Sequence, residues 1–487
     1  MHPTGAQAPS TLRVLETFAM VLQLDQPEVA FDSSALEALA TRLAGEMILP
    51  EDARYDAARR VWNKEFLRRP SLVVRAADVM DVMHTVDFAR CQNLPLAVRS
   101  GGHSLAGFGS VDDGVVLDLS LLKGISIDPE RQTAWVQPAV TSEELAPRAA
   151  EYGLGLSTGD APTVGIGGLT LGGGIGFMVR KYGLTIDSLL AAEVVTADGK
   201  LVTASSTEHP DLFWALRGGG GNFGIVTAFQ FQLRPVGTVL GGALIYPATP
   251  EVVGDYARRA LAAPDGLTTI TLLLKAPPLP IIPEELHGRL ILMILAVYLG
   301  DLEEGRNALE PLRTLGPGLV DLTGPMPYHA IFDFTRDPTV SSHHVGRTLF
   351  LREFPDTLAE IVINHLERGT SPLSIAQIRP LGGALARVPN DATAFAHRDA
   401  PYMLAVINDW DGPDAEAEAP IHHAWVQEFW NAVRPYGSGV YVNFLEAEER
   451  GRIREAYPGD TYARLAAVKR RYDPTNFFRQ NQNVVPS

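Results

Sequence analysis

A short polar loop holds the first residues whose types and spacing favour chemistry. Residues 99–104 have the sequence RSGGHS and follow the apolar run 94–98, which predicts a β-strand. Glycines after a strand let the backbone turn sharply and direct several N–H groups at one anion. Arg99 would add a fixed positive charge, although a tight turn with a solvated histidine fits the pattern equally well. The candidate anion-binding residues are Arg99, Ser100, Gly101, Gly102, His103 and Ser104.

Two further stretches are rich in glycine. Residues 159–168 (GDAPTVGIGG) and 172–177 (GGGIGF) place glycines in an apolar context. Each glycine costs about 0.5–1 kcal/mol of conformational entropy relative to alanine, so a purely structural role is a weak explanation for so many. A large flat cofactor that lies against the backbone explains them better.

Gly219, Gly221 and Gly224 match the dinucleotide-binding pattern G-x-G-x-x-G, but their context differs from the one this motif needs. The fingerprint must follow a strand and open a helix. Here the helix-like stretch 211–217 comes first, and the alternating run 225–233 predicts a strand afterwards. We therefore expect no nicotinamide-binding Rossmann domain.

Other catalytic or metal-binding devices find little support. The chain has no G-x-S-x-G elbow and no H-E-x-x-H helix. The pairs His343–His344 and His422–His423 are adjacent, so their side chains point apart, and packing or surface positions suit them better than metal ligation. Cys91, the single cysteine, is expected to be a small packed residue in a helix.

Composition restricts the class of protein. The 487 residues are 46% apolar and 20% charged, which is typical of a globular chain with two or three domains. The net charge of −16 argues against nucleic acid or anionic membranes as partners. We expect no membrane span, because no run of about 18 apolar residues exists, and no signal peptide. With one cysteine and no intrachain disulfide, a cytoplasmic location is expected.

Three segments with different patterns would position these residues. Residues 1–60 look helical, and residues 70–235 alternate short strands with helices and tight turns. Residues 237–440 contain long strand-like runs followed by helices, which favours an antiparallel sheet with one covered face. The expected fold class is α+β. The expected divisions are residues 1–236, 237–440 and 441–487.

Taken in order, the motifs resemble FAD-linked oxidases of the vanillyl-alcohol oxidase type, in the berberine-bridge-enzyme-like branch and nearest its bacterial, 6-hydroxynicotine-oxidase-like members. The motifs are RSGGHS, DAPTVGIGG, GGGIGF, KYGLTID, LFWALRGGGGNFGIVT, YVNF, YDPTNFF and NQN. The resemblance implies a FAD-binding domain of the PCMH type with two subdomains, a substrate domain, and a C-terminal segment that returns to the FAD domain. It also implies a covalent bond between FAD and His103. Many relatives form a second bond through a cysteine where this chain has Ala161, so a single link and a smaller substrate are expected.

The resemblance also assigns roles around the flavin. Val164 would set oxygen access, and Leu169 would lie near the flavin pyrimidine. The segment that would meet the adenine contains Gly224, Ile225 and Val226. The loop that would cover the cofactor contains Tyr182, Gly183 and Asp187. The residues that would complete the flavin site are Tyr441, Asn443 and Asn481. The other implied cofactor positions are Gly107, Gly159, Asp160, Ala161, Thr163, Gly165, Gly168, Gly173, Gly174, Gly176 and Phe177.

The catalytic base is the least defined part of the pattern. The two positions where relatives carry a base hold Phe444 and Met403 here. An alcohol normally needs a base near the transferred proton, whereas an amine that binds in its neutral form does not, so the pattern favours C–N over C–OH oxidation. The remaining candidates for substrate contact, each explained as well by packing, are Tyr441, Tyr402, Gln377 and His329.

The expected function is therefore a FAD-dependent oxidase that transfers a hydride from a small organic substrate to the flavin and is reoxidised by dioxygen, giving hydrogen peroxide. A dehydrogenase of the same fold is one alternative, against which Val164 argues. An oxidative cyclase would use the same residues. A non-catalytic binding protein would have no use for His103. Residues 1–60 would either cap the FAD domain or form a homodimer contact.

Overall fold

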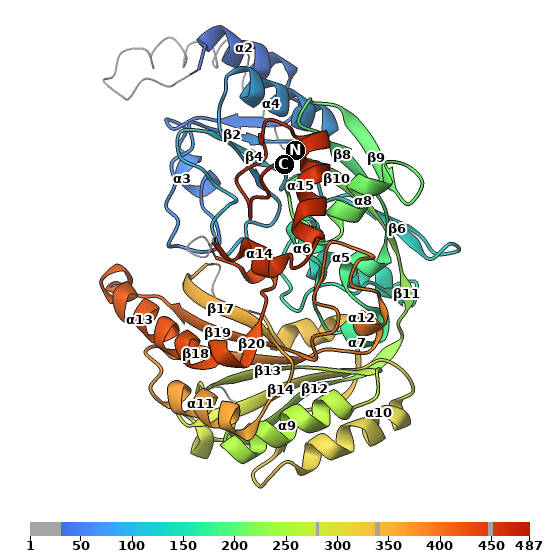
Figure 1. The fold of residues 1–487 in the computed structure, drawn as a ribbon, viewed down its shortest axis with the longest axis vertical. Coiled ribbons are helices and arrows are strands. Elements are labelled where there is room, and N and C mark those ends of the chain that lie inside the picture. The colour runs from blue at the N-terminus through green and yellow to red at the C-terminus, as the bar shows by residue number, and fades with distance from the viewer. Residues whose placement is uncertain (1–30, 279–281, 337–340, 447–450) are drawn as a thin grey trace, which may run out of the picture.

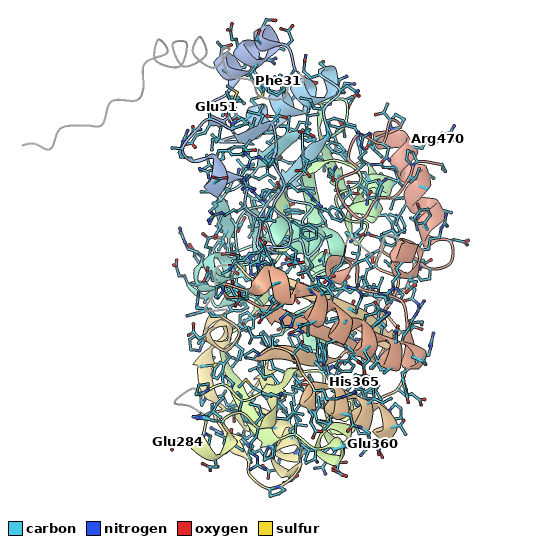
Figure 2. The ribbon with its side chains drawn as sticks, turned by 90° about the vertical axis from the view of Figure 1, so that its left-hand side faces the viewer. Phe31, Glu51, Glu284, Glu360, His365 and Arg470 are labelled. Atoms are coloured by element: carbon cyan, nitrogen blue, oxygen red, sulfur yellow. The ribbon has the colours of Figure 1, made fainter. Side chains whose placement is uncertain are left out.

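The computed structural model describes residues 31–278, 282–336, 341–446 and 451–487. The molecule is elongated, with a four-stranded sheet towards one end and a nine-stranded sheet towards the other (Figure 1). Phe31 and Glu51 lie at the first end, and Glu284 and Glu360 lie at the second (Figure 2). No helix in the described ranges is long and apolar enough to cross a bilayer.

The N-terminal segment is only partly helical. Helix α2 (Ser33–Arg42) begins after Asp32, whose side chain accepts a hydrogen bond from the Ser34 N–H and caps the helix. Strand β1 (Glu46–Ile48) follows, so the expectation that residues 1–60 are helical throughout is wrong. The buried Ile48 side chain explains the strand, because it extends the apolar face of the first sheet. The first 30 residues of that expectation lie outside the described residues.

The four-stranded sheet presents the histidine-bearing loop. Its strands, in spatial order, are β1, β2 (Leu72–Arg75), β4 (Val115–Asp118) and β3 (Leu96–Arg99), and the last three are parallel. Helix α4 (Val79–Cys91) makes the crossover between β2 and β3 and lies with α2 on one face (Figure 1). Cys91 ends this helix and is exposed, so the expectation of a packed cysteine is wrong.

A five-stranded antiparallel sheet follows in the chain. We call the part of the molecule formed by these two sheets the FAD side, after the resemblance of residues 70–236 to a FAD-binding domain. Its strands, in spatial order, are β5 (Ile125–Asp128), β6 (Thr133–Val136), β10 (Ile225–Gln232), β8 (Leu189–Val195) and β9 (Leu201–Ser205). Helix α8 (Pro210–Leu216) precedes the glycines at 218–221, and β10 follows them. This helix–loop–strand order is the reverse of a Rossmann turn, as expected. The helices around the site are α5 (Ser142–Ala150), α6 (Ile166–Gly172) and α7 (Val179–Tyr182).

The nine-stranded sheet is antiparallel throughout, as the sequence predicts. Its long strands, in spatial order, are β12 (Thr238–Pro247), β14 (Leu290–Tyr298), β13 (Leu267–Lys275), β18 (Leu373–Pro380), β19 (Tyr402–Trp410) and β17 (His343–Leu351). Three short strands lie at its edges, namely β15 (Val320–Asp321), β16 (Gly324–Pro327) and β20 (Gly437–Ser438). Helices α9 (Pro250–Ala262), α10 (Leu302–Leu309) and α11 (Asp356–Glu367) lie below it in Figure 1, and α13 (Ala415–Val433) packs into the same core through Val426.

Side chains alternate between the two faces of this sheet. Leu273 and Leu404 belong to the core under the helices, whereas Ile270 and Met403 face the FAD side. The FAD-facing side is met by segments from distant parts of the chain, including a 3-10 helix at Tyr328–Phe334 and another at Val442–Phe444. The α+β fold class is confirmed.

The C-terminal segment returns to the FAD side. Helix α15 (Thr461–Tyr472) lies beside α8 (Figure 1), and the buried Lys469 ammonium donates to the Asn222 carbonyl at 2.7 Å. The division into residues 1–236, 237–440 and 441–487 remains a proposal. The other short helices are α3 (Tyr55–Ala58), α12 (Ala384–Arg387) and α14 (Ile453–Ala456), and a short pair is formed by β7 (Leu154–Gly155) and β11 (Arg234–Pro235).

Candidate active site

Two glycine-containing loops touch through their backbones. A Cβ atom placed on Gly101 would lie 2.6 Å from the Gly165 nitrogen, and one placed on Gly165 would lie 2.7 Å from the Gly101 nitrogen. The Ser100 hydroxyl donates to the Pro138 carbonyl at 2.6 Å and holds the first loop in this position. The absence of side chains at both glycines therefore allows residues 100–104 and 159–168 to interlock.

His103 projects from this junction. Its Nε2 atom lies 3.2 Å from the Thr163 hydroxyl, and its ring stacks on Trp62 with centroids 5.8 Å apart. The backbone N–H of Trp62 donates to the Gly102 carbonyl at 3.0 Å, so the tryptophan is fixed to the same loop. Nothing in the local sequence around Trp62 indicates this role, and the sequence analysis missed it.

The loop also offers donors without protein acceptors. Among the described residues, none accepts a hydrogen bond from the backbone N–H groups of Gly101, Gly102 or Ser104. Gly168 is exposed, and a Cβ atom there would meet nothing within 4 Å. Converging N–H donors beside an open, side-chain-free surface suit a large anionic cofactor such as FAD.

Arg99 does not contribute a free charge to this loop. Its guanidinium donates to the Asp118 carboxylate at 2.8 Å and to the Arg60 carbonyl at 2.9 Å, and its side chain is buried. The expectation that Arg99 adds positive charge at the anion site is wrong, because Asp118 on β4 neutralises it. Arg99 instead ties β3 to β4.

Tyr441 is held by two donors. The Gly174 N–H and the Asn443 side-chain amide donate to its hydroxyl at 2.8 Å and 2.9 Å, and the same amide donates to the Leu169 carbonyl at 3.1 Å. Burial raises the pKa of Tyr441 to about 12. The hydroxyl therefore keeps its proton, and since both lone pairs are used, it can act only as a hydrogen-bond donor towards a ligand.

Asp160 makes a bidentate ion pair with Arg379 of β18. The two oxygen–nitrogen distances are 3.0 Å and 2.9 Å, and the arginine side chain is only 3% exposed. Arg379 also donates to the Gln377 side-chain oxygen at 2.8 Å and lies over the Phe444 ring at 5.5 Å. The sequence analysis did not single out Arg379, because its partner is 219 residues away in the chain.

These contacts close into a ring. From Asp160 they pass through Arg379 to Phe444, then to Tyr441 at a centroid distance of 5.3 Å, and on through Asn443 to Leu169. The Leu169 side chain packs against Gly159, which precedes Asp160. We call this set the contact ring: Gly159, Asp160, Leu169, Arg379, Tyr441, Asn443 and Phe444. Ala161, Thr163 and Val164 follow Asp160 directly, and Thr163 connects the ring to His103.

Several expected site residues lie elsewhere. The Tyr402 hydroxyl donates to the Ala257 carbonyl at 3.1 Å under the helices, on the far face of the sheet, so its assignment as a substrate contact is withdrawn. The described contacts do not connect His329 to the contact ring. Other predicted cofactor residues have protein contacts of their own, and their cofactor roles remain predictions: Phe177, Ile225 and Val226 are core side chains, Tyr182 donates to the Pro235 carbonyl, Asp187 pairs with Arg398, and Asn481 donates to the Gly221 carbonyl.

Protein packing explains most of the glycines. A Cβ atom on Gly174 would lie 1.9 Å from the Thr185 hydroxyl, and one on Gly176 would lie 2.0 Å from the Thr158 carbonyl. The prediction that a cofactor explains these glycines is therefore wrong for most of them, and Gly168 is the exception. Among the predicted cofactor glycines, those whose added Cβ would meet protein atoms within 3.4 Å are Gly101, Gly107, Gly159, Gly165, Gly173, Gly174, Gly176, Gly183 and Gly224.

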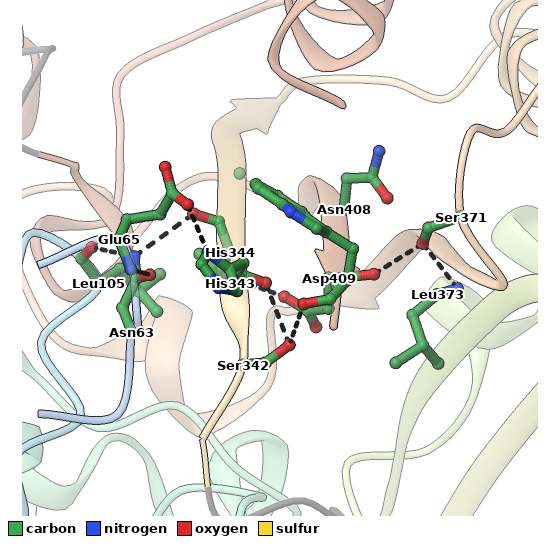
Figure 3. A network of polar contacts seen from close by, with 12 residues as sticks. Asn63, Glu65, Leu105, Ser342, His343, His344, Ser371, Leu373, Asn408 and Asp409 are labelled. Atoms are coloured by element: carbon green, nitrogen blue, oxygen red, sulfur yellow. Dashed lines mark hydrogen bonds and ion pairs between the residues drawn. The ribbon is translucent and has the colours of Figure 1, made fainter. Parts of the chain in front are cut away.

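The adjacent histidines of β17 point apart, as the sequence predicts. His343 lies 2.6 Å from Glu65, and His344 lies 2.5 Å from Asp409 (Figure 3). Burial lowers the pKa of His344, but the neighbouring carboxylates outweigh it, and the pKa is raised overall. Within the described ranges, no group of three His, Cys, Asp or Glu side chains could hold a metal ion.

Comparison with known proteins agrees with this geometry. Residues 70–205 match the FAD binding domain family, and residues 440–485 match the family described as berberine and berberine like. The chain is 33% identical over 466 residues to (R)-6-hydroxynicotine oxidase of Paenarthrobacter nicotinovorans, covering 92% of this chain and 98% of that protein. It is 28% identical over 449 residues to xylooligosaccharide oxidase of Thermothelomyces thermophilus, covering 86% and 88%.

Solved structures show the same architecture. 6-Hydroxy-D-nicotine oxidase from Arthrobacter nicotinovorans superposes with a TM-score of 0.80 at 30% identity, covering 91% of this chain and 98% of that one. A chitooligosaccharide oxidase gives 0.81 at 22% identity, covering 93% and 100%, and supports the fold alone. The chain belongs to the berberine-bridge-enzyme-like family of FAD-linked oxidoreductases. It is an enzyme, and its cofactor is FAD.

Proposed function

We propose that the protein is an oxidase that holds FAD through one covalent bond to His103, oxidises a small organic substrate at a C–N or C–OH group, and uses dioxygen as electron acceptor. The position of His103 carries the proposal. Its ring is held between Trp62 and Thr163, next to N–H groups of its own loop that have no acceptor among the described residues. Ala161 has no atom that could form a second bond.

When bound, FAD supplies the two-electron redox chemistry, and the protein supplies binding and orientation. The backbone N–H groups of Gly101, Gly102 and Ser104, which have no acceptor among the described residues, would bind the pyrophosphate. Tyr441, in the C-terminal segment 441–487, would donate a hydrogen bond to the bound ligand. Its raised pKa of about 12 prevents it from acting as a base near neutral pH. Val164 is partly exposed beside Thr163 and is small enough to leave a path for dioxygen.

The contact ring favours a substrate that needs no base. Its one carboxylate, Asp160, is occupied by both terminal nitrogens of Arg379. An alcohol would require proton removal near the reacting carbon, whereas a neutral amine would not. Oxidation of a C–N bond is therefore the preferred reaction, with C–OH oxidation as the alternative.

Acid precipitation of the purified protein tests the covalent link. We expect yellow flavin to stay with the denatured wild-type chain and to move to the supernatant in His103→Ala, while His329→Ala, a histidine outside the contact ring, keeps it bound. Flavin released from the wild type would refute the link but leave the FAD enzyme standing. A His103→Ala pellet that stays yellow would refute the assignment to His103.

Peroxide measurement under air tests the electron acceptor. We expect about one hydrogen peroxide per substrate molecule oxidised. Substrate oxidation without peroxide, restored by a quinone or a dye, would establish a dehydrogenase instead. A cytoplasmic location and a homodimer remain proposals.

A further inference from the structure

Part of the nine-stranded sheet is open on its FAD-facing side. Leu272, Ile375, Gln377 and Ile407 are partly exposed, although they lie on the central strands β13, β18 and β19 and their sequence neighbours are mostly buried. Direct pairing places Gln377 opposite Ala405 and Ile375 opposite Ile407. These four partly exposed side chains, with the buried Ala405 that pairs with Gln377, make up what we call the floor.

Gln377 is the only polar side chain of the floor, and its orientation is fixed. Arg379 donates to its side-chain oxygen at 2.8 Å. Because a guanidinium can only donate, the amide oxygen must face Arg379 and the NH₂ group must face away from it. No described residue accepts a hydrogen bond from this NH₂ group, and Gln377 is partly exposed, so a ligand on the floor can reach it.

The floor carries no uncompensated charge. Asp160 binds both terminal nitrogens of Arg379, and the two side chains are 17% and 3% exposed. The remaining floor residues are apolar. A charged group placed here would lose its hydration without gaining a counterion, which is strongly unfavourable. A sugar would leave most of its hydroxyls without partners on this surface.

We infer that Gln377 recognises the substrate of the proposed oxidase, and that this substrate is a small neutral molecule, mostly apolar, with a hydrogen-bond acceptor that meets the Gln377 NH₂ group. The inference rests on the proposed function, because it assigns the substrate class of that site. Arg379 acts through Gln377 as a positioning residue. The charge-free floor suits an apolar molecule and disfavours oligosaccharides and carboxylates.

Three probes of related size separate these classes. Acetophenone is neutral, apolar and has one acceptor; benzoate has a similar shape but is anionic; cellobiose is neutral but rich in hydroxyls. Each is titrated into the flavin-loaded enzyme, and binding is followed by the change in the flavin absorption spectrum. We expect acetophenone to bind at least tenfold more tightly than benzoate or cellobiose.

Two variants locate the contact. Gln377→Leu should weaken acetophenone binding by roughly threefold to tenfold, the range of one hydrogen bond. Thr271→Val is the matched control, because Thr271 exchanges hydrogen bonds with the Ile378 backbone on the same sheet but lies outside the floor. This control should lower stability and leave the affinity unchanged.

The outcomes separate the inference from the proposed function. Equal or tighter binding of benzoate or cellobiose, no binding of acetophenone, or unchanged affinity in Gln377→Leu would each overturn the substrate class while the oxidase stands. A purified protein without flavin would refute the proposed function. The same titrations followed by thermal unfolding would then still test the ligand class.

Discussion

Two arginine–aspartate pairs connect the FAD side to the segments around the nine-stranded sheet, and they share one geometry. Asp160 pairs with Arg379 at 3.0 and 2.9 Å, and Asp187 pairs with Arg398 at 2.7 and 2.8 Å. Both arginines are almost fully buried. Their surroundings differ, and this difference separates a structural ion pair from one that belongs to the site.

The Asp187 pair is enclosed by the protein. Its carboxylate also accepts the Leu184 N–H at 2.8 Å, and Arg398 also donates to the Thr393 hydroxyl at 2.8 Å. The Asp160 pair instead borders the partly exposed Gln377 and the Phe444 ring. The Asp187–Arg398 pair therefore fixes the loop that follows α7, whereas the Asp160–Arg379 pair shapes a ligand surface.

The largest expected effect is the loss of the enclosed pair. Asp187→Asn should lower the free energy of unfolding by about 3–5 kcal/mol, because it leaves the Arg398 charge buried and uncompensated. Urea denaturation of the flavin-loaded enzyme measures this change. Glu428→Gln is the control: its partner Arg368 is 60% exposed, so the loss should stay below about 1 kcal/mol. Equal losses in the two variants would contradict the distinction.

The Asp160–Arg379 pair, which we call the site pair, should lose less stability when its aspartate is replaced. Asp160→Asn should lower stability by about 1.5–3 kcal/mol, less than Asp187→Asn, because the Asp160 side chain is 17% exposed against 10% for Asp187 and the remaining Arg379 charge borders the partly exposed Gln377. It should also weaken acetophenone binding and slow covalent flavin incorporation, because Thr163 and His103 depend on the same segment. Spectral titration and acid precipitation measure both. An Asp160→Asn enzyme as unstable as Asp187→Asn, with unchanged binding and flavin content, would make the two pairs equivalent.

The sequence identified both aspartates but not the ion pairs that they form. Asp160 and Asp187 lie in local motifs, so spacing and resemblance could single them out as cofactor positions. Their arginine partners lie 219 and 211 residues further on, in strands and loops without a recognisable pattern. Trp62 escaped notice for the same reason, because its contact with His103 exists only in the folded chain.

Secondary structure was predicted more successfully, because its signals are local. The alternating run at 225–233 and the helix-like run before the glycines gave the correct order of α8 and β10. The glycines themselves were located correctly but explained incorrectly. A glycine needed for a cofactor and one needed for a neighbouring backbone look the same in a sequence, and only the positions of nearby atoms distinguish Gly168 from Gly165.

Two glycine substitutions extend the comparison from side chains to backbone. Gly165→Ala should destabilise the protein by about 1–3 kcal/mol and reduce flavin content, because the new methyl group meets the backbone of Gly101. Gly168→Ala should stabilise flavin-free protein by about 0.5–1 kcal/mol, since it lies in α6 with open space around it. It should still reduce flavin content if the cofactor lies there. Thermal unfolding and the ratio of flavin to protein absorbance decide both.

Tyr441 gives the smallest effect and reports directly on the site pair. Burial raises its pKa to about 12, and the charges of Arg379 and Asp160 act on it in opposite directions. Tyr441→Phe should cost about 1 kcal/mol through the lost acceptor for the Gly174 N–H. Because the folded-state pKa is raised above the unfolded value of about 10, this difference should stay constant below pH 10, shrink above it and reverse in sign before pH 12.

Urea denaturation of both proteins from pH 6 to 12 measures this dependence, and subtracting the two curves removes the other titrating groups. A difference that changed between pH 7 and 9 would mean that Tyr441 ionises there and could serve as a base. In Asp160→Asn the uncompensated charge of Arg379 should lower the folded-state pKa of Tyr441, so the loss should still begin near pH 10 but end at a lower pH. An unchanged end point would show that Asp160 does not balance Arg379 at this site, and the distinction between the two pairs would lose its electrostatic basis.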